Sequence, residues 1–189
     1  MAGHPIVRAR SLDGRLQALP VLVHAFDDAA PVAAVYVGYD DGSFFLLRPL
    51  SNTAEHIPFA APEGSAFLVQ SVEVASSHAR RASFIILDRA LRELARTNWD
   101  TPFDPRERPW FRLAAEPGKR VLTPPYVFAT THAPGLTVAI RSLHSAVVGL
   151  DLTLAQISER LAPMRGMPDM KIVLFDQQRQ LLARAWLQR

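Results

Sequence analysis

VAAVYVGYDDGSFFLLRPL, residues 32–50, consists of two apolar runs around the acidic turn Asp40-Asp41-Gly42. Two such runs joined by a tight turn that ends in glycine are typical of a β-hairpin. Both runs are apolar almost throughout, so we expect this sheet to be covered on both faces. Helix should cover one face, and further chain or a ligand pocket the other.

The segments on either side of the hairpin differ in pattern. Before it, residues 11 to about 30 predict a long N-terminal helix, which Pro20 could kink. Its apolar residues recur at three- and four-residue steps, at Leu12, Leu16, Leu19, Val23 and Phe26. After the hairpin, residues 51–65 contain two prolines and a glycine without a clear period, which predicts a long loop.

Further strands are predicted at residues 66–74 and 83–88. We expect the second of them to turn back through a hairpin into residues 91–97. The alternative for residues 88–97 is a helix, because their intrinsic propensities are helical.

Short helices and strands alternate in the rest of the chain. The expected elements are a turn at Asp104, a helix at 109–115, and strands at 126–130, 136–143 and 146–152. Thr153 and Gln156 form a capping box for a helix that ends before Gly166. Hairpin connections dominate and no βαβ period occurs, so the predicted fold class is α+β with an antiparallel sheet.

The last residues predict one more strand pair, KIVLFD and LLARAW, around a turn at 177–179. An isolated hairpin is only marginally stable in water, so we expect it to open a second, truncated module. The expected organisation is an N-terminal helical segment at 1–31, a main module at 32–166, and the first hairpin of an incomplete module at 167–189.

Composition excludes several classes of function. The 189-residue chain has no cysteine, which excludes disulfides and thiolate-based zinc sites. Its net charge of +3 comes from scattered arginines and two lysines, so no basic stripe predicts nucleic-acid binding. No apolar run reaches the ~18 residues of a membrane-spanning helix. The histidines lack metal-binding spacing and no catalytic motif is present, so we expect neither a metal, a cofactor nor an enzyme.

FDPRERPWF, residues 103–111, places an arginine and a tryptophan at the start of a predicted helix. Proline disfavours helical geometry in the preceding residue, so Pro109 should hold Arg108 extended while being itself the first helical residue. Arg108 and Trp110 can then face one pocket, an arrangement suited to a small carboxylate. The alternative is a surface arginine beside a core tryptophan.

Four segments follow one another along the chain: YVGYDDGSFFLLR at 36–48, DPRERPWFRLAA at 104–115, LTPPYVF at 122–128 and AVVGLDLTLAQIS at 146–158. In this order and spacing they resemble the double Cache family of sensor domains. The resemblance implies a PAS-like antiparallel sheet with a long N-terminal helix and a membrane-distal ligand pocket. It also implies an extracytoplasmic, periplasmic location in a bacterial receptor whose membrane helices and output domain lie outside this chain.

The same resemblance implies a set of ligand-binding residues. The positions that match the amino-acid-binding signature are Phe103, Arg108, Trp110, Phe111, Tyr126 and Asp151. In that family the arginine and tryptophan hold the ligand carboxylate, and the later tyrosines with the aspartate hold its ammonium. Phe103 and Phe111 stand where the signature has tyrosines, so two hydroxyl groups are absent. This departure favours simpler organic acids alongside amino acids.

Structural roles are the alternatives for these residues. Asp151 could satisfy local backbone donors, and Arg108 could form an ion pair with Glu107, Asp104 or Asp151. The leading hypothesis is nevertheless a sensor of a small carboxylate, an organic acid or an amino acid, that signals to a cytoplasmic output domain. The alternative is a ligand-free module for homodimerisation or protein interaction. Any catalytic activity of an intact protein is expected in an output domain outside this chain.

Overall fold

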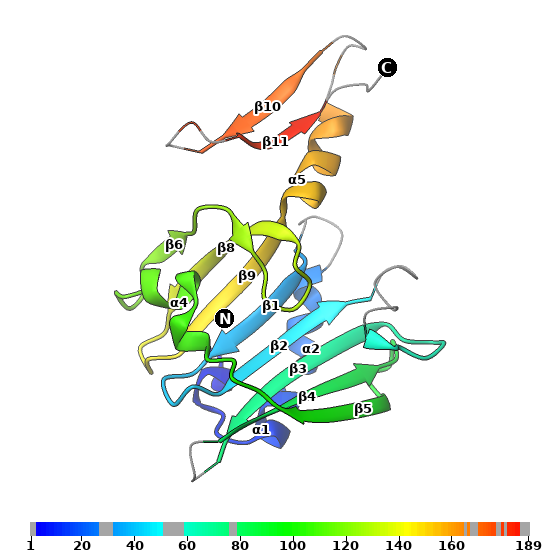
Figure 1. Cartoon of the computed structure of the whole chain (residues 1–189), viewed down its shortest axis with the longest axis vertical. Coiled ribbons are helices and arrows are strands. Elements are labelled where there is room, and N and C mark those ends of the chain that lie inside the picture. Colours follow the sequence, from blue (N-terminus) through cyan, green and yellow to red (C-terminus); the bar gives the residue numbers. More distant parts are fainter. Residues whose placement is uncertain are drawn as a thin grey trace.

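A large antiparallel sheet forms the centre of the molecule (Figure 1). The computed structural model describes residues 3–26, 32–50, 59–75, 79–164, 166, 170–176, 179 and 181–185. Within them, nine strands join in the order β5-β4-β3-β2-β1-β9-β8-β6, with β7 also paired to β8. The strands are β1 Ala34–Gly38, β2 Phe44–Pro49, β3 Phe67–Val74, β4 Arg80–Leu87, β5 Glu93–Asp100, β6 Arg120–Leu122, β7 Tyr126–Val127, β8 Pro134–Arg141 and β9 Val147–Thr153. The predicted α+β class with an antiparallel sheet is confirmed.

The predicted hairpin forms the middle of the sheet as β1 and β2. Its turn contains Gly42, whose φ of 90° lies in the left-handed region that favours glycine. Asp41 stabilises the same turn, because its carboxylate accepts a hydrogen bond from the backbone N–H of Ser43 at 2.8 Å. On its other side β1 pairs with β9, so residues 34–38 lie opposite residues 147–151. The hairpin thus brings the two ends of the module together.

The hairpin strand predicted for residues 91–97 is confirmed as part of β5, and the helix alternative for residues 88–97 is wrong. β4 turns at Asp88, whose side chain accepts hydrogen bonds from the backbone N–H groups of Ala90 and Arg92. β5 then pairs with β4 along its length. Cross-strand pairing therefore outweighs the helical propensities of this segment.

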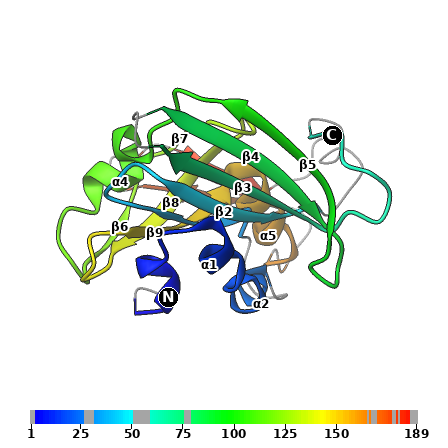
Figure 2. The same cartoon turned by 90° about the horizontal axis from the view of Figure 1, so that it is seen from below.

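The N-terminal segment is not the single helix predicted from residue 11 to about 30. It is divided into η1 Pro5–Arg8, α1 Leu12–Leu16, α2 Leu19–Leu22 and η2 Val23–Phe26, while residues 27–31 lie outside the described residues. Pro20 begins a new helix at its second position, where a missing N–H costs nothing, instead of kinking an older one. These turns pack beneath the sheet (Figure 2), where Leu22 meets Val35 and Phe45 in one buried cluster.

On the opposite face, the chain after β5 crosses the sheet. It forms η4 Pro105–Glu107 and α4 Pro109–Leu113, as predicted, and then the unpredicted strand β6. β7 is shorter than the strand predicted at 126–130, and β8 begins at Pro134, two residues before the strand predicted at 136–143. Most of the predicted loop at 51–65 lies outside the described residues.

The capping box is confirmed, because Thr153 and Gln156 bond reciprocally at the start of α5 Leu154–Leu161, which continues into η5 Ala162–Met164. The predicted C-terminal hairpin is also present as a separate two-stranded sheet of β10 Ile172–Phe175 and β11 Leu181–Ala185. In Figure 1 it lies beyond α5, away from the large sheet. The domain boundaries at 31 and 166 and the truncation of a second module stay predictions.

Candidate functional site

The floor of the candidate site is built by one face of the central strands. Successive side chains of a strand point to opposite faces. Val35, Val37 and Phe45 accordingly join the cluster beneath the N-terminal helices. Tyr36 and Phe44 instead join the cluster under α4, together with Trp110. The central strands therefore separate a helix-covered face from a face with polar and aromatic side chains.

A small cleft of about 30 Å³, partly open to solvent, lies on this second face. Its lining residues are Tyr36, Phe44, Leu46, Arg48, Phe103, Arg108, Trp110, Tyr126, Phe128, Ala129, Thr130 and Asp151. A largely aromatic lining with a few charged groups is typical of a small-molecule site.

Arg108 and Trp110 reach the cleft in the way that the sequence predicts. Arg108 is extended, with φ −79° and ψ 147°, and Pro109 is the first residue of α4. The Arg108 side chain is half-buried and its guanidinium carbon lies 6.0 Å from the centre of the Tyr126 ring. No carboxylate of the described residues forms an ion pair or hydrogen bond with it. Its charge is therefore available to an anion in the cleft.

Trp110 is only 3% exposed, and its ring centre lies 4.8 Å from that of Tyr36. Close approach to β1 depends on Gly38, since a Cβ there would meet the indole at 2.5 Å. Within the described part of the chain, the indole N–H donates no hydrogen bond. A buried tryptophan usually finds an acceptor, so an acceptor from a ligand would complete this site.

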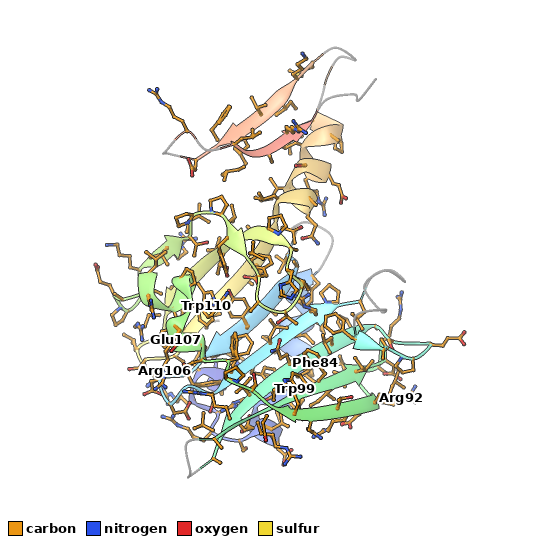
Figure 3. The ribbon with its side chains drawn as sticks, in the orientation of Figure 1. Phe84, Arg92, Trp99, Arg106, Glu107 and Trp110 are labelled. Carbon is orange, nitrogen blue, oxygen red and sulfur yellow. The ribbon has the colours of Figure 1, made fainter. Side chains whose placement is uncertain are left out.

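A separate ion-pair cluster fixes the turn that carries Arg108. Asp104, buried at the start of η4, pairs with Arg80 of β4 at 2.5 Å and with Arg106 at 2.7 Å. The hydrogen bond from Arg106 is the largest cause that lowers the pKa of Asp104 below its ordinary value. Figure 3 shows Arg106 and Glu107 at this turn, with Trp110 nearby. Asp104 thus neutralises Arg80 and Arg106 instead of Arg108.

Asp151, 5% exposed, ends a chain of buried hydroxyl groups. Its Oδ1 accepts from Tyr36 at 2.8 Å and from Thr137 at 2.6 Å. Tyr126 lies 2.7 Å from the Thr137 hydroxyl. Because Thr137 has one hydroxyl hydrogen and gives it to Asp151, Tyr126 donates to Thr137. The order of donation is therefore Tyr126 to Thr137 to Asp151.

Burial is the largest cause of the pKa shifts in this hydrogen-bonded chain of side chains. It raises the pKa of Asp151 from 3.8 to about 6, against the hydrogen bonds from Thr137 and Tyr36 and the attraction of Arg48 and Arg108. Burial, followed by the charge of Asp151, raises the pKa of Tyr126 to about 12 and that of Tyr36 well above its ordinary value. At neutral pH both tyrosines are neutral donors, and Asp151 is ionised in most molecules, with its midpoint about one pH unit lower.

The structure brings five of the six predicted residues to one cleft: Phe103, Arg108, Trp110, Tyr126 and Asp151. Phe111 lies outside its lining. It is buried beside Trp110, with the guanidinium of Arg141 stacked 4.9 Å from its ring. A binding role for any of the six stays a prediction.

Several lining residues were missed by the sequence reasoning, most notably Arg48 and Tyr36. Both lie in the strands of the hairpin, where only their alternation with Leu47 and Val35 could have indicated the cleft face. Thr130 was also missed; its hydroxyl donates to Gln70 of β3 at 2.8 Å, which links the β7–β8 loop to the sheet.

No group of three histidine, aspartate or glutamate side chains among the described residues is arranged to hold a metal ion. The same residues contain no helix long and apolar enough to span a bilayer.

Comparison with known proteins identifies the class of fold. No protein-family model matches the chain. The ligand-binding domain of chemoreceptor Tlp3 of Campylobacter jejuni, in complex with L-valine, has a TM-score of 0.53 and 15% identity over 97% of this chain and 57% of its own. The ligand-binding domain of chemoreceptor CtaA of Pseudomonas fluorescens, in complex with L-serine, has a TM-score of 0.53 and 20% identity over 96% of this chain and 59% of its own. The ligand-binding domain of chemoreceptor PctB of Pseudomonas aeruginosa, in complex with L-Gln, has a TM-score of 0.52 and 20% identity over 96% of this chain and 55% of its own.

The chain therefore has the fold of bacterial chemoreceptor ligand-binding domains, and the resemblance to sensor domains is confirmed at the level of the fold. In sequence it is similar to adenylate cyclase 1 of Rhizobium meliloti (strain 1021), with 34% identity over 137 residues. These residues are 71% of this chain and 21% of the cyclase. The chain thus spans a minor part of that relative and somewhat more than half of the sensor structures.

Proposed function

We propose that this chain is an extracytoplasmic sensor domain whose cleft binds a small carboxylate, an organic acid or an amino acid. One observation carries the proposal: Arg108 lines the cleft without an ion-pair partner among the described residues. A half-buried guanidinium offers a planar pair of donors that match a carboxylate. Trp110 lines the same cleft, and its indole N–H could serve as a further donor. The fold similarity to ligand-binding domains supports the same function.

The domain would act on an output domain outside this chain. The similarity to an adenylate cyclase supports a cyclase among the candidates, and the sensor fold supports a periplasmic or extracellular position. Binding can change output only if the ligand favours one of two arrangements of the domain. The small-molecule ligand is therefore proposed as the signal, and this chain as its receiver.

The ligand-free alternative, a dimerisation or protein-interaction module, receives less support. It would be favoured by a cleft filled with the phenylalanines that replace the tyrosines of the signature. Phe103 does line the cleft, but Phe111 packs outside it, so only one of the two rings is in a position to fill the cleft.

A binding screen with two arginine variants tests the proposal. Small mono- and dicarboxylates and amino acids are screened by thermal shift, and binders are measured by calorimetry. Arg108→Ala should weaken binding by about tenfold or more, since hydrogen bonds to charged groups contribute about 1.5–3 kcal/mol. Arg112→Ala removes an exposed arginine from the same helix and should leave affinity unchanged. A binder that is insensitive to Arg108→Ala would refute this site.

A further inference from the structure

Thr137 is a buried threonine that lies behind the cleft and contacts three of its lining side chains. It is 0% exposed and does not itself line the cleft. Its hydroxyl oxygen lies 2.6 Å from Oδ1 of Asp151, 2.7 Å from the hydroxyl of Tyr126 and 3.1 Å from that of Tyr36. Its backbone N–H donates to the Thr123 hydroxyl at 2.9 Å. One buried hydroxyl group therefore joins three side chains that line the cleft.

The charge of Asp151 determines which of these groups donate. At neutral pH Asp151 is ionised in most molecules, and a carboxylate can only accept. Tyr36 and Thr137 therefore each give their single hydroxyl hydrogen to Asp151. Tyr126 must then give its own hydrogen to Thr137, because Thr137 has no second one. The hydroxyl hydrogens of both tyrosines are thus engaged within the protein.

The oxygens of these side chains are left as acceptors for a ligand. A tyrosine hydroxyl whose hydrogen is donated elsewhere retains lone pairs and cannot donate again. Asp151 adds a further acceptor, since both of its hydrogen bonds end at Oδ1 and no described residue donates to Oδ2. The guanidinium carbon of Arg108 lies 6.0 Å from the centre of the Tyr126 ring. A carboxylate bound by Arg108 therefore lies close to this phenol.

We propose that Thr137 is a positioning residue that makes the cleft prefer a 2-hydroxy acid to the 2-oxo acid with the same carbon skeleton. This inference rests on the proposed function and deepens it. A hydroxyl group next to the carboxylate has a hydrogen for the acceptors of the cleft, whereas an oxo group has only lone pairs. An oxo group facing acceptors would leave polar groups unpaired. Thr137 sets this preference without touching the ligand, because it holds the hydrogen of Tyr126.

Three acids with one carbon skeleton test the preference on the wild-type chain. Calorimetry at about pH 7.5, where Asp151 is ionised, is run with both enantiomers of lactate, with pyruvate and with propionate. The tighter-binding enantiomer of lactate should exceed pyruvate in affinity by about tenfold or more. Propionate has neither group and measures what the carboxylate contributes alone. Because this comparison uses no variant, it does not depend on how a substitution folds.

Variants then assign the preference to Thr137. Thr137→Val keeps the branched shape and removes the hydroxyl, so the hydrogen of Tyr126 becomes available to an oxo group. The ratio of the lactate affinity to the pyruvate affinity should fall from about tenfold to about threefold or less. Thr137→Ser keeps a hydroxyl group and should keep the ratio of the wild type. Thr97→Val, the same change at an exposed position of β5, is the matched control.

Tyr126→Phe gives a second test that leaves Thr137 in place. It removes the acceptor oxygen, so lactate affinity should fall about fivefold or more, while propionate affinity should stay within about threefold. Circular dichroism checks that each variant is folded. If Thr137→Val does not fold, the ratio in Thr137→Ser and the loss in Tyr126→Phe decide.

The outcomes separate this inference from the proposed function. It is overturned if pyruvate binds the wild-type chain as tightly as lactate, if Thr137→Val weakens lactate and pyruvate equally, or if none of the acids binds. In each of these cases the carboxylate sensor still stands when the wider screen finds a ligand whose affinity depends on Arg108. When the screen finds no such ligand, the proposed function fails as well.

Discussion

Asp151→Asn should make the protein more stable at neutral pH, although it alters a buried hydrogen-bonded residue. Burial raises the pKa of Asp151 from 3.8 to about 6, so the folded protein holds this proton more tightly than the unfolded chain. Stability must then fall as pH rises from about 4 to about 6, and stay lower above that range. The interval corresponds to about 3 kcal/mol at most. Asparagine has no charge to bury, and its carbonyl can still accept from Tyr36 and Thr137.

Urea unfolding between about pH 4 and pH 8 measures this effect. The variant should exceed wild type by about 2–3 kcal/mol near pH 7.5, and the difference should shrink to within about 0.5 kcal/mol near pH 4. Asp100→Asn, at an exposed position of β5, is the control and should give no such trend. A difference between Asp151→Asn and wild type that does not change with pH would refute the reasoning.

Two further predictions follow from the same cleft. Gly149→Ala would place a methyl group 2.2 Å from the Tyr36 ring, so urea unfolding should show a loss of about 1–3 kcal/mol. Gly166→Ala, whose methyl group meets nothing within 4 Å, should stay within about 0.5 kcal/mol of wild type. The affinity for a carboxylate without an ammonium group that the binding screen identifies, measured by calorimetry, should rise as pH falls from about 8 to about 6, because an anion favours the protonated form of Asp151. An α-amino acid whose ammonium contacts Asp151 should show the opposite trend, so a carboxylate affinity independent of pH would contradict this coupling.

Local signals predicted the parts of the fold that depend on short stretches of chain. The hairpin around Gly42, the capping box at Thr153 and the extended Arg108 before Pro109 are each decided within a few residues. The N-terminal helix was wrong because its apolar period continues through Pro20, while the backbone restarts there. Periodicity reports which face is buried and does not show whether the helix is continuous.

The sequence predicted only those parts of the site whose residues lie together in one short segment. Tyr36 and Asp151 are joined by a hydrogen bond across 115 positions of sequence, so their contact depends on β1 pairing with β9. Arg48 is one polar residue in an apolar strand of the sequence, and only its alternation with Leu47, once β2 is paired with β1, assigns it to the cleft face. Phe111 follows Trp110 by one helical position, about 100° around the axis, and therefore cannot share its direction.

The same strands connect the cleft to the rest of the molecule. Tyr36 faces the cleft, while its neighbours Val35 and Val37 contact the cluster under the N-terminal helices. Asp151 precedes Thr153, the N-cap of α5, by two residues of β9. A ligand that changes the partners of Asp151 therefore acts at the root of α5 and one strand layer from the N-terminal helices. Since packed interiors deform little, such a change can reach those helices only by favouring one discrete arrangement of β1 and β9 over another.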